Sequence, residues 1–284
     1  MYKNIINNAN IKNKNKNNKF DIEDINENID AGTIFYNTLL KHKVKTSFIY
    51  SGGSVMPLVD KFYKGDIKYY INSHEQNCGH AATGYAKISG RPGIVLVTSG
   101  PGITNMITPM LDATNDSTPL IVFSGQVPLN AVGSNAFQEA PAVGLSKNVT
   151  KWSYQIRDIL EIEDVIDKAF KIAMDKKKGA VHIDIPKCVA STKMPLNEYM
   201  IKHKYYSKMY SEDNIISVIK EKMQIYTKKY RNNNNLKKII SVINNSKKPV
   251  IYLGQGCCDD YKLLRKFALN GNIPVTTTIH GNGV

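Results

Sequence analysis

The chain alternates short apolar runs with amphipathic segments over most of its length, and this alternation restricts its fold more than any other feature. Asp30 can cap a first helix, which places one set of apolar side chains on one face: Ile34, Phe35, Leu39, Leu40 and Val44. Strands are expected at 47–50, 67–71, 93–98, 120–123 and 180–185, and further helices at about 75–88, from about 103, and at about 162–174. Strands that alternate with helices favour an α/β fold, with a mostly parallel sheet flanked by helices on both faces.

Composition divides the chain into four parts. Residues 1–29 are rich in Asn and Lys and lack periodicity, so we expect a disordered or targeting tail. Residues 30–190 are expected to form the α/β domain, which Pro186 helps to end, and the polar stretch 191–212 to be a linker. The start of a second α/β domain is expected at 213–284, with helices near 215–223 and 236–243 and strands at 250–253 and 273–277. Because so few strands cannot close a sheet, we expect this second domain to be truncated and the chain to be a fragment.

Charge and cysteine content argue against several classes of function. The formal charge of +14 first suggests nucleic acid, but the lysines gather in the tail and between residues 202 and 238, without an RNA-binding or helix-turn-helix signature. No apolar run approaches the roughly 18 residues that cross a bilayer. The spacing of the four cysteines matches neither a zinc site nor a disulfide framework. We therefore expect no nucleic-acid or membrane partner and no metal site within this chain.

The first candidate site is the segment His74-Glu75-Gln76-Asn77-Cys78-Gly79-His80-Ala81, which follows a strand and opens a helix. Such positions at the carboxyl ends of strands face the crevice in which α/β sheets bind ligands. The alternative is that Glu75 is only an acidic residue at a helix N-terminus, where the helix dipole favours it. His74 and His80 do not have the four-residue spacing of a zinc-binding helix.

Three further segments also follow expected strands. Val97-Thr-Ser-Gly-Pro-Gly-Ile-Thr-Asn105 has glycines that permit close backbone approach, but it has neither the dinucleotide nor the phosphate-loop spacing. Ala136-Phe-Gln-Glu139 lies in a long loop, where binding residues are often found. Asp184-Ile-Pro-Lys187 places a lysine after a strand, although a surface lysine is the simpler interpretation.

Taken together, these segments resemble the catalytic subunit of the acetolactate synthase family over residues 31–284. The resemblance rests on the four segments above and on Tyr50-Ser-Gly-Gly53, Gly84-Tyr-Ala86, Ser124-Gly-Gln-Val-Pro128, Thr150-Lys-Trp152 and Pro274-Val-Thr-Thr-Thr278. So many motifs in the order of the family make the resemblance specific. It implies an N-terminal portion only: a pyrimidine-binding domain for thiamine diphosphate and the start of the central, FAD-associated domain.

The resemblance implies an enzyme that uses thiamine diphosphate, Mg²⁺ and FAD. It would decarboxylate pyruvate and condense it with a second 2-oxoacid, pyruvate or 2-oxobutanoate, in branched-chain amino-acid biosynthesis. A homodimer or homotetramer is implied, with a regulatory subunit as a further partner. A mitochondrion or plastid is the expected location, with the cytoplasm as the alternative. A sister carboligase, or a truncated non-catalytic product, remains an alternative to this function.

The resemblance also assigns roles to single residues. Glu75 is similar to the carboxylate that binds ring nitrogen N1′ of the aminopyrimidine, so that the cofactor can lose its carbon-bound proton. Catalytic roles are expected for Glu75, Gln138 and Lys187. Contacts with thiamine diphosphate are expected from Tyr50, Gly53, Asn105, Phe137 and Gln138. Contacts with FAD are expected from Lys177, Gly254, Gln255, Gly256, Thr278 and Ile279.

The sequence departs from the family pattern in three places. Ser51 replaces a proline before the paired glycines, and Lys177 replaces an arginine, whose planar donors a lysine cannot reproduce. The Gly-Asp-Gly motif that holds Mg²⁺ and the diphosphate in the C-terminal domain of the family is absent. We therefore expect the fragment alone to be inactive.

Overall fold

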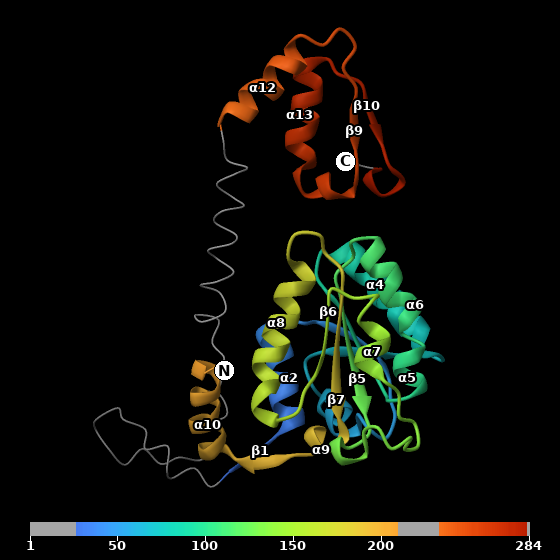
Figure 1. Ribbon diagram of the computed structural model, residues 1–284, viewed down its shortest axis with the longest axis vertical. Helices are drawn as coiled ribbons and strands as arrows, with labels where there is room; N and C mark the ends of the chain where they lie inside the picture. Colours follow the sequence, from blue (N-terminus) through green and yellow to red (C-terminus); the bar gives the residue numbers. More distant parts are fainter. Residues whose placement is uncertain (1–26, 210–232, 283–284) are drawn as a thin grey trace, which may run out of the picture. The chain divides into compact units, whose positions relative to one another are not determined.

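The computed structural model describes residues 27–209 and 233–282, which form two compact units that divide between Met209 and Tyr210 (Figure 1). Most of the expected tail and the expected helix near 215–223 lie outside the described residues. Each unit is described by itself below.

The first unit is built on a six-stranded sheet in which every neighbouring pair of strands is parallel. The strand order is β3-β2-β4-β5-β7-β6. The strands are β2 (Thr46–Tyr50), β3 (Lys68–Ile71), β4 (Gly93–Val97), β5 (Leu120–Gln126), β6 (Trp152–Gln155) and β7 (Ala180–Pro186). The sequence prediction of a parallel α/β sheet is thereby confirmed.

Helices cover both faces of this sheet and enclose two apolar cores (Figure 1). The first core lies under α2 (Ala31–Lys41), α3 (Met56–Val59), η2 (Asp60–Phe62), η4 (Ile159–Glu161) and α8 (Ile162–Met174). The second lies under α4 (Glu75–Ser89), α5 (Pro101–Thr104), α6 (Ile107–Asn115) and α7 (Ala142–Ser146). Strand side chains point alternately to the two faces, so each buried strand contributes to both cores.

Local signals explain where the helices begin and end. The Asp30 carboxylate accepts a hydrogen bond of 2.7 Å from the backbone N–H of Thr33 and caps α2, as expected. At the end of α4, Gly90 adopts the left-handed conformation with φ of 68°, which glycine tolerates best. The amphipathic pattern of α8 predicted the bounds at which that helix occurs.

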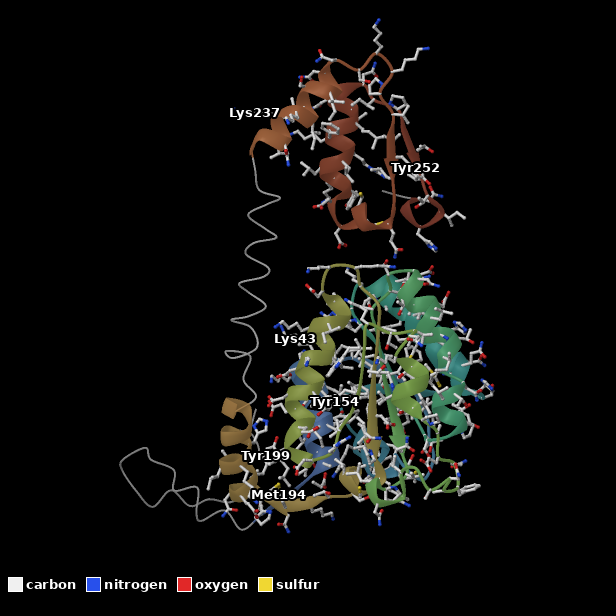
Figure 2. The ribbon with its side chains drawn as sticks, viewed as in Figure 1. Lys43, Tyr154, Met194, Tyr199, Lys237 and Tyr252 are labelled. Carbon is white, nitrogen blue, oxygen red and sulfur yellow. The ribbon has the colours of Figure 1, made fainter. Side chains whose placement is uncertain are left out.

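The structure differs from the expected linker at 191–212. Residues 187–209 form α9 (Lys187–Ala190), β8 (Lys193–Pro195) and α10 (Leu196–Met209), and β8 pairs antiparallel with β1 (Asn28–Asp30). Tyr199 of α10 is fully buried and belongs to the first core (Figure 2). Its aromatic ring packs as an apolar residue although the surrounding sequence is polar. The first unit therefore extends past Pro186 to Met209, and residues 28 and 29 are part of a strand.

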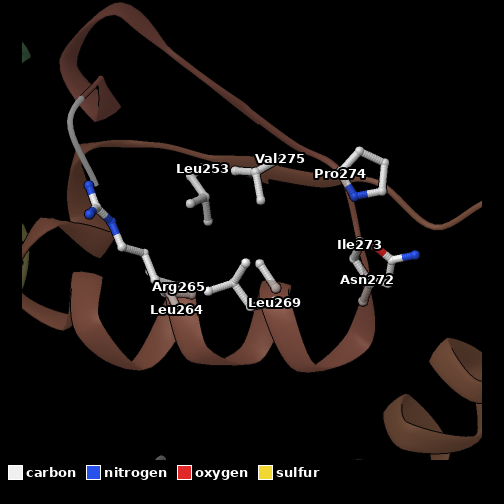
Figure 3. A pocket seen from close by; sticks show the side chains of 9 residues that line it. Leu253, Leu264, Arg265, Leu269, Asn272, Ile273, Pro274 and Val275 are labelled. Atoms are coloured by element: carbon white, nitrogen blue, oxygen red, sulfur yellow. The ribbon is translucent and has the colours of Figure 1, made fainter.

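Within residues 233–282, the second unit contains a two-stranded parallel sheet and two longer helices. Its elements are α12 (Asn233–Asn244), β9 (Ile251–Leu253), η5 (Gln255–Asp260), α13 (Tyr261–Gly271), β10 (Val275–Thr277) and η6 (Ile279–Gly281). Between α13 and the strands lies a hollow of about 510 Å³, into which Leu253, Leu269 and Val275 point (Figure 3). Most apolar side chains of the unit are exposed, Leu263 and Leu269 among them. Every helix within residues 27–209 and 233–282 is too short or too polar to cross a bilayer.

Candidate functional site

The turns that follow five parallel strands meet at the carboxyl edge of the first sheet. Parallel strands end at the same edge, so the side chains that follow them are brought together. These turns carry Glu75 after β3, Gly53 after β2, Asn105 after β4, Phe137 and Gln138 after β5, and Lys187 after β7. The spacing of these residues along the chain gives no indication of this proximity, which depends on the strand order.

Glu75 is the first residue of α4, and only 7% of it is exposed. The preceding residue, His74, caps the helix through its Nδ1, which accepts a hydrogen bond of 3.1 Å from the Gln76 N–H. Asn105 donates a hydrogen bond of 2.9 Å from its side-chain nitrogen to Glu75 Oε2. Among the described residues, no other side chain donates to this carboxylate. A buried carboxylate with one oxygen bound and the other available differs from the exposed helix-start acid that the simpler interpretation assumed.

The turn after β2 interlocks with the turn after β4. A Cβ at Gly52 would overlap the Thr98 side chain, so only glycine fits there. Ser54 Oγ lies 3.0 Å from Thr98 Oγ1 and accepts a hydrogen bond of 3.2 Å from the Ser99 N–H. Gly53, by contrast, is exposed, and a Cβ there would meet nothing within 4 Å. The open space at Gly53 leaves room for a ligand beside a rigid turn.

The Gly-Pro-Gly turn also supports the loop that carries Phe137 and Gln138. Gly100 has a φ of 60°, and a Cβ there would lie 2.8 Å from the Gln138 carbonyl oxygen. Gln138 itself has a positive φ of 58°, which is uncommon for a residue other than glycine. The Gln138 backbone therefore packs directly against Gly100. The Gly-Pro-Gly turn after β4 and the loop after β5 are in contact at this point.

Glu139 organises the same loop from within. Its carboxylate accepts hydrogen bonds from the backbone N–H of Gly133 and, at 3.0 Å, of Ala136. The hydrogen bond from Gly133 holds the pKa of Glu139 below its usual value. Phe137, two residues earlier, is 89% exposed. The loop thus presents an apolar ring to solvent without any other element that covers it among the described residues.

The remaining expected site residues of the first unit lie in different places. Tyr50 is half-buried at the end of β2, and Lys187 is exposed at the start of α9, so both belong to the carboxyl edge. Lys177 is exposed between α8 and β7, and it therefore lies at the opposite, amino edge of the sheet. The structure does not bring Lys177 together with Glu75.

The expected FAD contacts of the second unit lie together. Gly254, Gln255 and Gly256 follow β9, and Thr278 and Ile279 follow β10, so all five are at the carboxyl edge of this small parallel sheet. The Thr278 N–H donates a hydrogen bond of 2.8 Å to the Leu253 carbonyl, which joins the two segments. Ile279 is 91% exposed.

Beside this edge lies a row of polar side chains whose burial was not predicted from the sequence. Ser124 and Gln126 of β5 and His182 and Asp184 of β7 are buried, and Gln155 of β6 is partly buried. Burial raises the pKa of Asp184 to about 6 and lowers that of His182 to about 3. A signal was present, because these residues alternate with apolar ones and so occupy one face of the strands. The described residues contain no group of three or more His, Cys, Asp or Glu side chains that could hold a metal ion.

Two protein families match the chain. Residues 29–145 match the thiamine pyrophosphate enzyme N-terminal TPP binding domain, and residues 236–284 match the thiamine pyrophosphate enzyme central domain. The first match covers the sheet from β2 to β5 together with Glu75, Asn105 and the loop after β5. The second covers the strands and glycines of the second unit.

Curated relatives carry acetolactate synthase names. The chain is 41% identical over 259 residues to "Acetolactate synthase, mitochondrial" of Schizosaccharomyces pombe, an alignment that covers 89% of this chain and 37% of that protein. It is 38% identical over 259 residues to "Acetolactate synthase catalytic subunit, mitochondrial" of Saccharomyces cerevisiae, covering 90% of this chain and 36% of that protein. It is 35% identical over 250 residues to "Acetolactate synthase large subunit" of Lactococcus lactis, covering 87% of this chain and 40% of that protein.

The chain therefore spans 36 to 40% of the length of these relatives. Both family matches agree with the two α/β units, and the first includes the buried carboxylate at the carboxyl edge of the larger sheet. The chain therefore carries the N-terminal TPP binding domain and part of the central domain of thiamine pyrophosphate enzymes, and it is a homologue of acetolactate synthase catalytic subunits.

Proposed function

We propose that the chain is the N-terminal portion of an acetolactate synthase catalytic subunit that decarboxylates pyruvate and joins it to a second 2-oxoacid, pyruvate or 2-oxobutanoate. The observation that carries this proposal is the buried Glu75 carboxylate, held by Asn105 at the carboxyl edge of the sheet. The names of the relatives support the same reaction.

The residues at this edge fit the aminopyrimidine of thiamine diphosphate. Asn105 binds one oxygen of Glu75 and so fixes the plane of the carboxylate, which leaves the other oxygen for a ring nitrogen. Gly53 offers open space beside a turn that Thr98 and Ser54 hold rigid. When bound, thiamine diphosphate supplies the acidic carbon that adds to the 2-oxoacid. Glu75 would hold a proton at ring nitrogen N1′, in a site that its burial keeps from bulk water.

The exposed residues of the edge suit recognition of the oxoacids. Lys187 carries a positive charge that can attract the substrate carboxylate, and it lies at the end of the strand next to β5. Phe137 and Gln138 stand on a loop that Gly100 and Glu139 fix in place. We therefore assign the entrance of the site to these residues and to Tyr50.

FAD would contact the second unit at the residues that directly follow its two strands, of which Gly256 and Ile279 are exposed and the others partly exposed: Gly254, Gln255, Gly256, Thr278 and Ile279. Lys177 is proposed as a further contact, with a single cationic group in place of a planar fork of donors. The described residues present no set of carboxylates for Mg²⁺, and we assign no step to that ion within this chain.

As partners we propose a second copy of the catalytic chain, in a homodimer or homotetramer, and a regulatory subunit. The proposal of a regulatory partner draws on the catalytic-subunit name of the Saccharomyces cerevisiae relative. We also propose that residues 1–29 direct the chain to a mitochondrion or plastid, and fusion of this segment to a fluorescent protein tests that location against the cytoplasm.

A chimera tests the function directly. Residues 30–284 would replace the corresponding segment of the Schizosaccharomyces pombe enzyme, and the product formed from pyruvate would be identified. Acetolactate is expected from the chimera and none from residues 1–284 alone. A folded chimera that releases acetaldehyde or another carboligation product would instead support a sister enzyme. If it forms no product at all, the non-catalytic alternative is favoured.

A further inference from the structure

A buried carboxylate joins the ends of three neighbouring strands. Asp184 lies opposite Ser124 of β5 and Gln155 of β6 in the strand register, and it is fully buried. Its Oδ1 accepts a hydrogen bond of 2.9 Å from Ser124 Oγ, and its Oδ2 accepts one of 2.8 Å from Gln155 Nε2 and one of 3.4 Å from Gln126 Nε2. All three donors are neutral. The carboxylate therefore acts as an acceptor that orients amide side chains rather than as half of an ion pair.

Gln126 connects this carboxylate to the loop that carries Phe137 and Gln138. Its Oε1 accepts a hydrogen bond of 2.9 Å from the Val127 N–H, and its Nε2 donates one of 2.8 Å to the Ala140 carbonyl. Val127 and Ala140 are the residues on either side of the loop 128–139. One side chain, only 2% exposed, thus bonds to the residues on both sides of the loop, and we call this pair, Val127 and Ala140, the neck of the loop.

The loop beyond this neck is held together by its own hydrogen bonds. The Glu139 N–H donates 2.9 Å to the Ala136 carbonyl, and the Glu139 carboxylate accepts from the Ala136 N–H at 3.0 Å. Because these bonds fix the loop internally, its position relative to the sheet depends on three contacts with the rest of the unit. These are the neck, the contact of Gln138 with Gly100, and Leu129, which donates its N–H to Cys188 Sγ at 3.4 Å and packs against the first core. A change at the neck moves the loop as one piece.

We propose that Gln126, oriented by Asp184, is a positioning residue for the loop 128–139. Its hydrogen bonds to Val127 and Ala140, which we call the clasp, hold the two ends of the loop together and so determine where Phe137 and Gln138 lie beside the Gly100 turn. The relevance to substrate rests on the proposed function, because Phe137 and Gln138 are assigned to the entrance of that site. The hydrogen bonds of the clasp are present in the chain without ligand.

Gln155 provides a matched control. It has the same amide group and donates to the same Asp184 oxygen, but among the described residues it makes no hydrogen bond to the loop. Gln126→Met and Gln155→Met remove the same chemical group from the same carboxylate. Only the first removes the bonds to Val127 and Ala140.

Hydrogen–deuterium exchange of the 284-residue chain without ligand tests the clasp. In Gln126→Met the Val127 amide loses its acceptor, and the Leu129 amide, whose bond to Cys188 Sγ joins the loop to α9, should be displaced with the loop. We expect both amides to exchange about tenfold faster, the factor for one net hydrogen bond, while the β5 amides keep their protection. In Gln155→Met the loop amides should exchange as in the unchanged chain. Equal loop exchange in the two variants overturns the proposal.

Gln126→Glu supplies a second test with a pH profile that a general packing defect does not produce. A protonated glutamic acid keeps one acceptor for Val127 and one donor for Ala140, whereas the ionised form has no donor and its charge faces Asp184. The other titratable groups nearby are His182 on β7 and Glu139 in the loop.

In Gln126→Glu, loop protection, corrected for the intrinsic exchange rate, should match that of the unchanged chain at low pH and fall as the new side chain ionises. If the protection stays constant across the titration, the clasp is not needed and the proposal fails. If the β5 amides of Gln126→Met also lose protection, that variant has a wider packing defect, and the pH profile of Gln126→Glu alone tests the proposal. Because neither readout uses cofactor or turnover, failure of the clasp is distinct from failure of the proposed enzyme activity.

Discussion

At the scale of single residues, Asp184 and His182 are buried on the same face of β7 and are joined through Ser124 Oγ, which lies 2.9 Å from Asp184 Oδ1 and 2.8 Å from His182 Nε2. Burial disfavours the charged form of each group, so the pKa of Asp184 rises to about 6 and that of His182 falls to about 3. The two shifts act on stability with opposite signs.

Asp184 binds its proton more tightly in the folded chain, so its contribution to stability is present below its unfolded pKa of 3.8 and is lost as the pH rises through about 6. His182 excludes its proton on folding, so its contribution grows as the pH rises from about 3 through its unfolded pKa of 6.5. Between pH 4 and pH 6 the two slopes oppose each other.

We predict that the free energy of unfolding of His182→Gln falls between pH 4 and pH 6, because the contribution of His182 no longer opposes that of Asp184. In Asp184→Asn it should rise over the same range. Each change should be on the order of 2 to 4 kcal/mol, since one unit of pKa shift corresponds to about 1.4 kcal/mol. Urea unfolding at several pH values measures both. Parallel pH curves for the two variants would show that these groups do not carry the shifts.

Sequence patterns identified some site residues and not others for physical reasons. Glu75 opens α4 after one expected strand, and Asn105 ends the short helix α5 after another, so the position of each beyond a strand end could be predicted. That Asn105 binds Glu75 depends on β2 separating β3 from β4 in the sheet, and the sequence does not contain that order explicitly. Gln126 and Asp184 lie in segments that carried the family resemblance, but their burial was not predicted, because polar residues at the ends of apolar strands ordinarily face solvent.

At the scale of elements, length decided what could be predicted. The helix α8 has enough turns for its apolar stripe to be clear, and its bounds were predicted. By contrast, β6 has four residues and α7 has five, too few for either periodicity to appear. The helix α10 was not predicted because Lys and Tyr are its most frequent residues, although Leu196 and Tyr199 are buried three residues apart.

We predict that α10 stabilises the first unit through Tyr199. Tyr199→Ala removes a fully buried aromatic ring and should lower the free energy of unfolding by about 3 to 5 kcal/mol. Ile201→Ala, two residues along the same helix, is the matched control, because Ile201 is 47% exposed and should cost about 1 kcal/mol or less. Urea unfolding followed by circular dichroism compares them. Equal losses would mean that α10 acts as the linker first expected.

At the scale of the whole molecule, the two units differ in how well they bury their apolar residues. The first unit has two cores on either side of a six-stranded sheet. Among the described apolar side chains of the second unit, only Leu253 is buried. A two-stranded sheet with an open apolar face is marginally stable.

We therefore predict that the second unit opens more readily than the first in the 284-residue chain. The Thr278 N–H, bonded to Leu253 at 2.8 Å, and the Ile156 N–H, bonded to Asp184 at 2.9 Å, are matched in length. Hydrogen exchange at Thr278 should be at least about 100-fold faster than at Ile156. Similar protection of both amides would contradict this difference between the units.

The proposed function requires that the Glu75 carboxylate, bound by Asn105, is the group that acts on the aminopyrimidine. Its most direct test is acetolactate formation by the chimera with the Schizosaccharomyces pombe enzyme. Glu75→Gln should lower kcat by at least about 100-fold, the factor of a lost general acid–base group, with unchanged thermal unfolding. Glu163→Gln makes the same chemical change in an ion pair with Lys41 on the opposite face of the sheet, and it should leave kcat unchanged. Equal kcat values for the two variants would contradict the account.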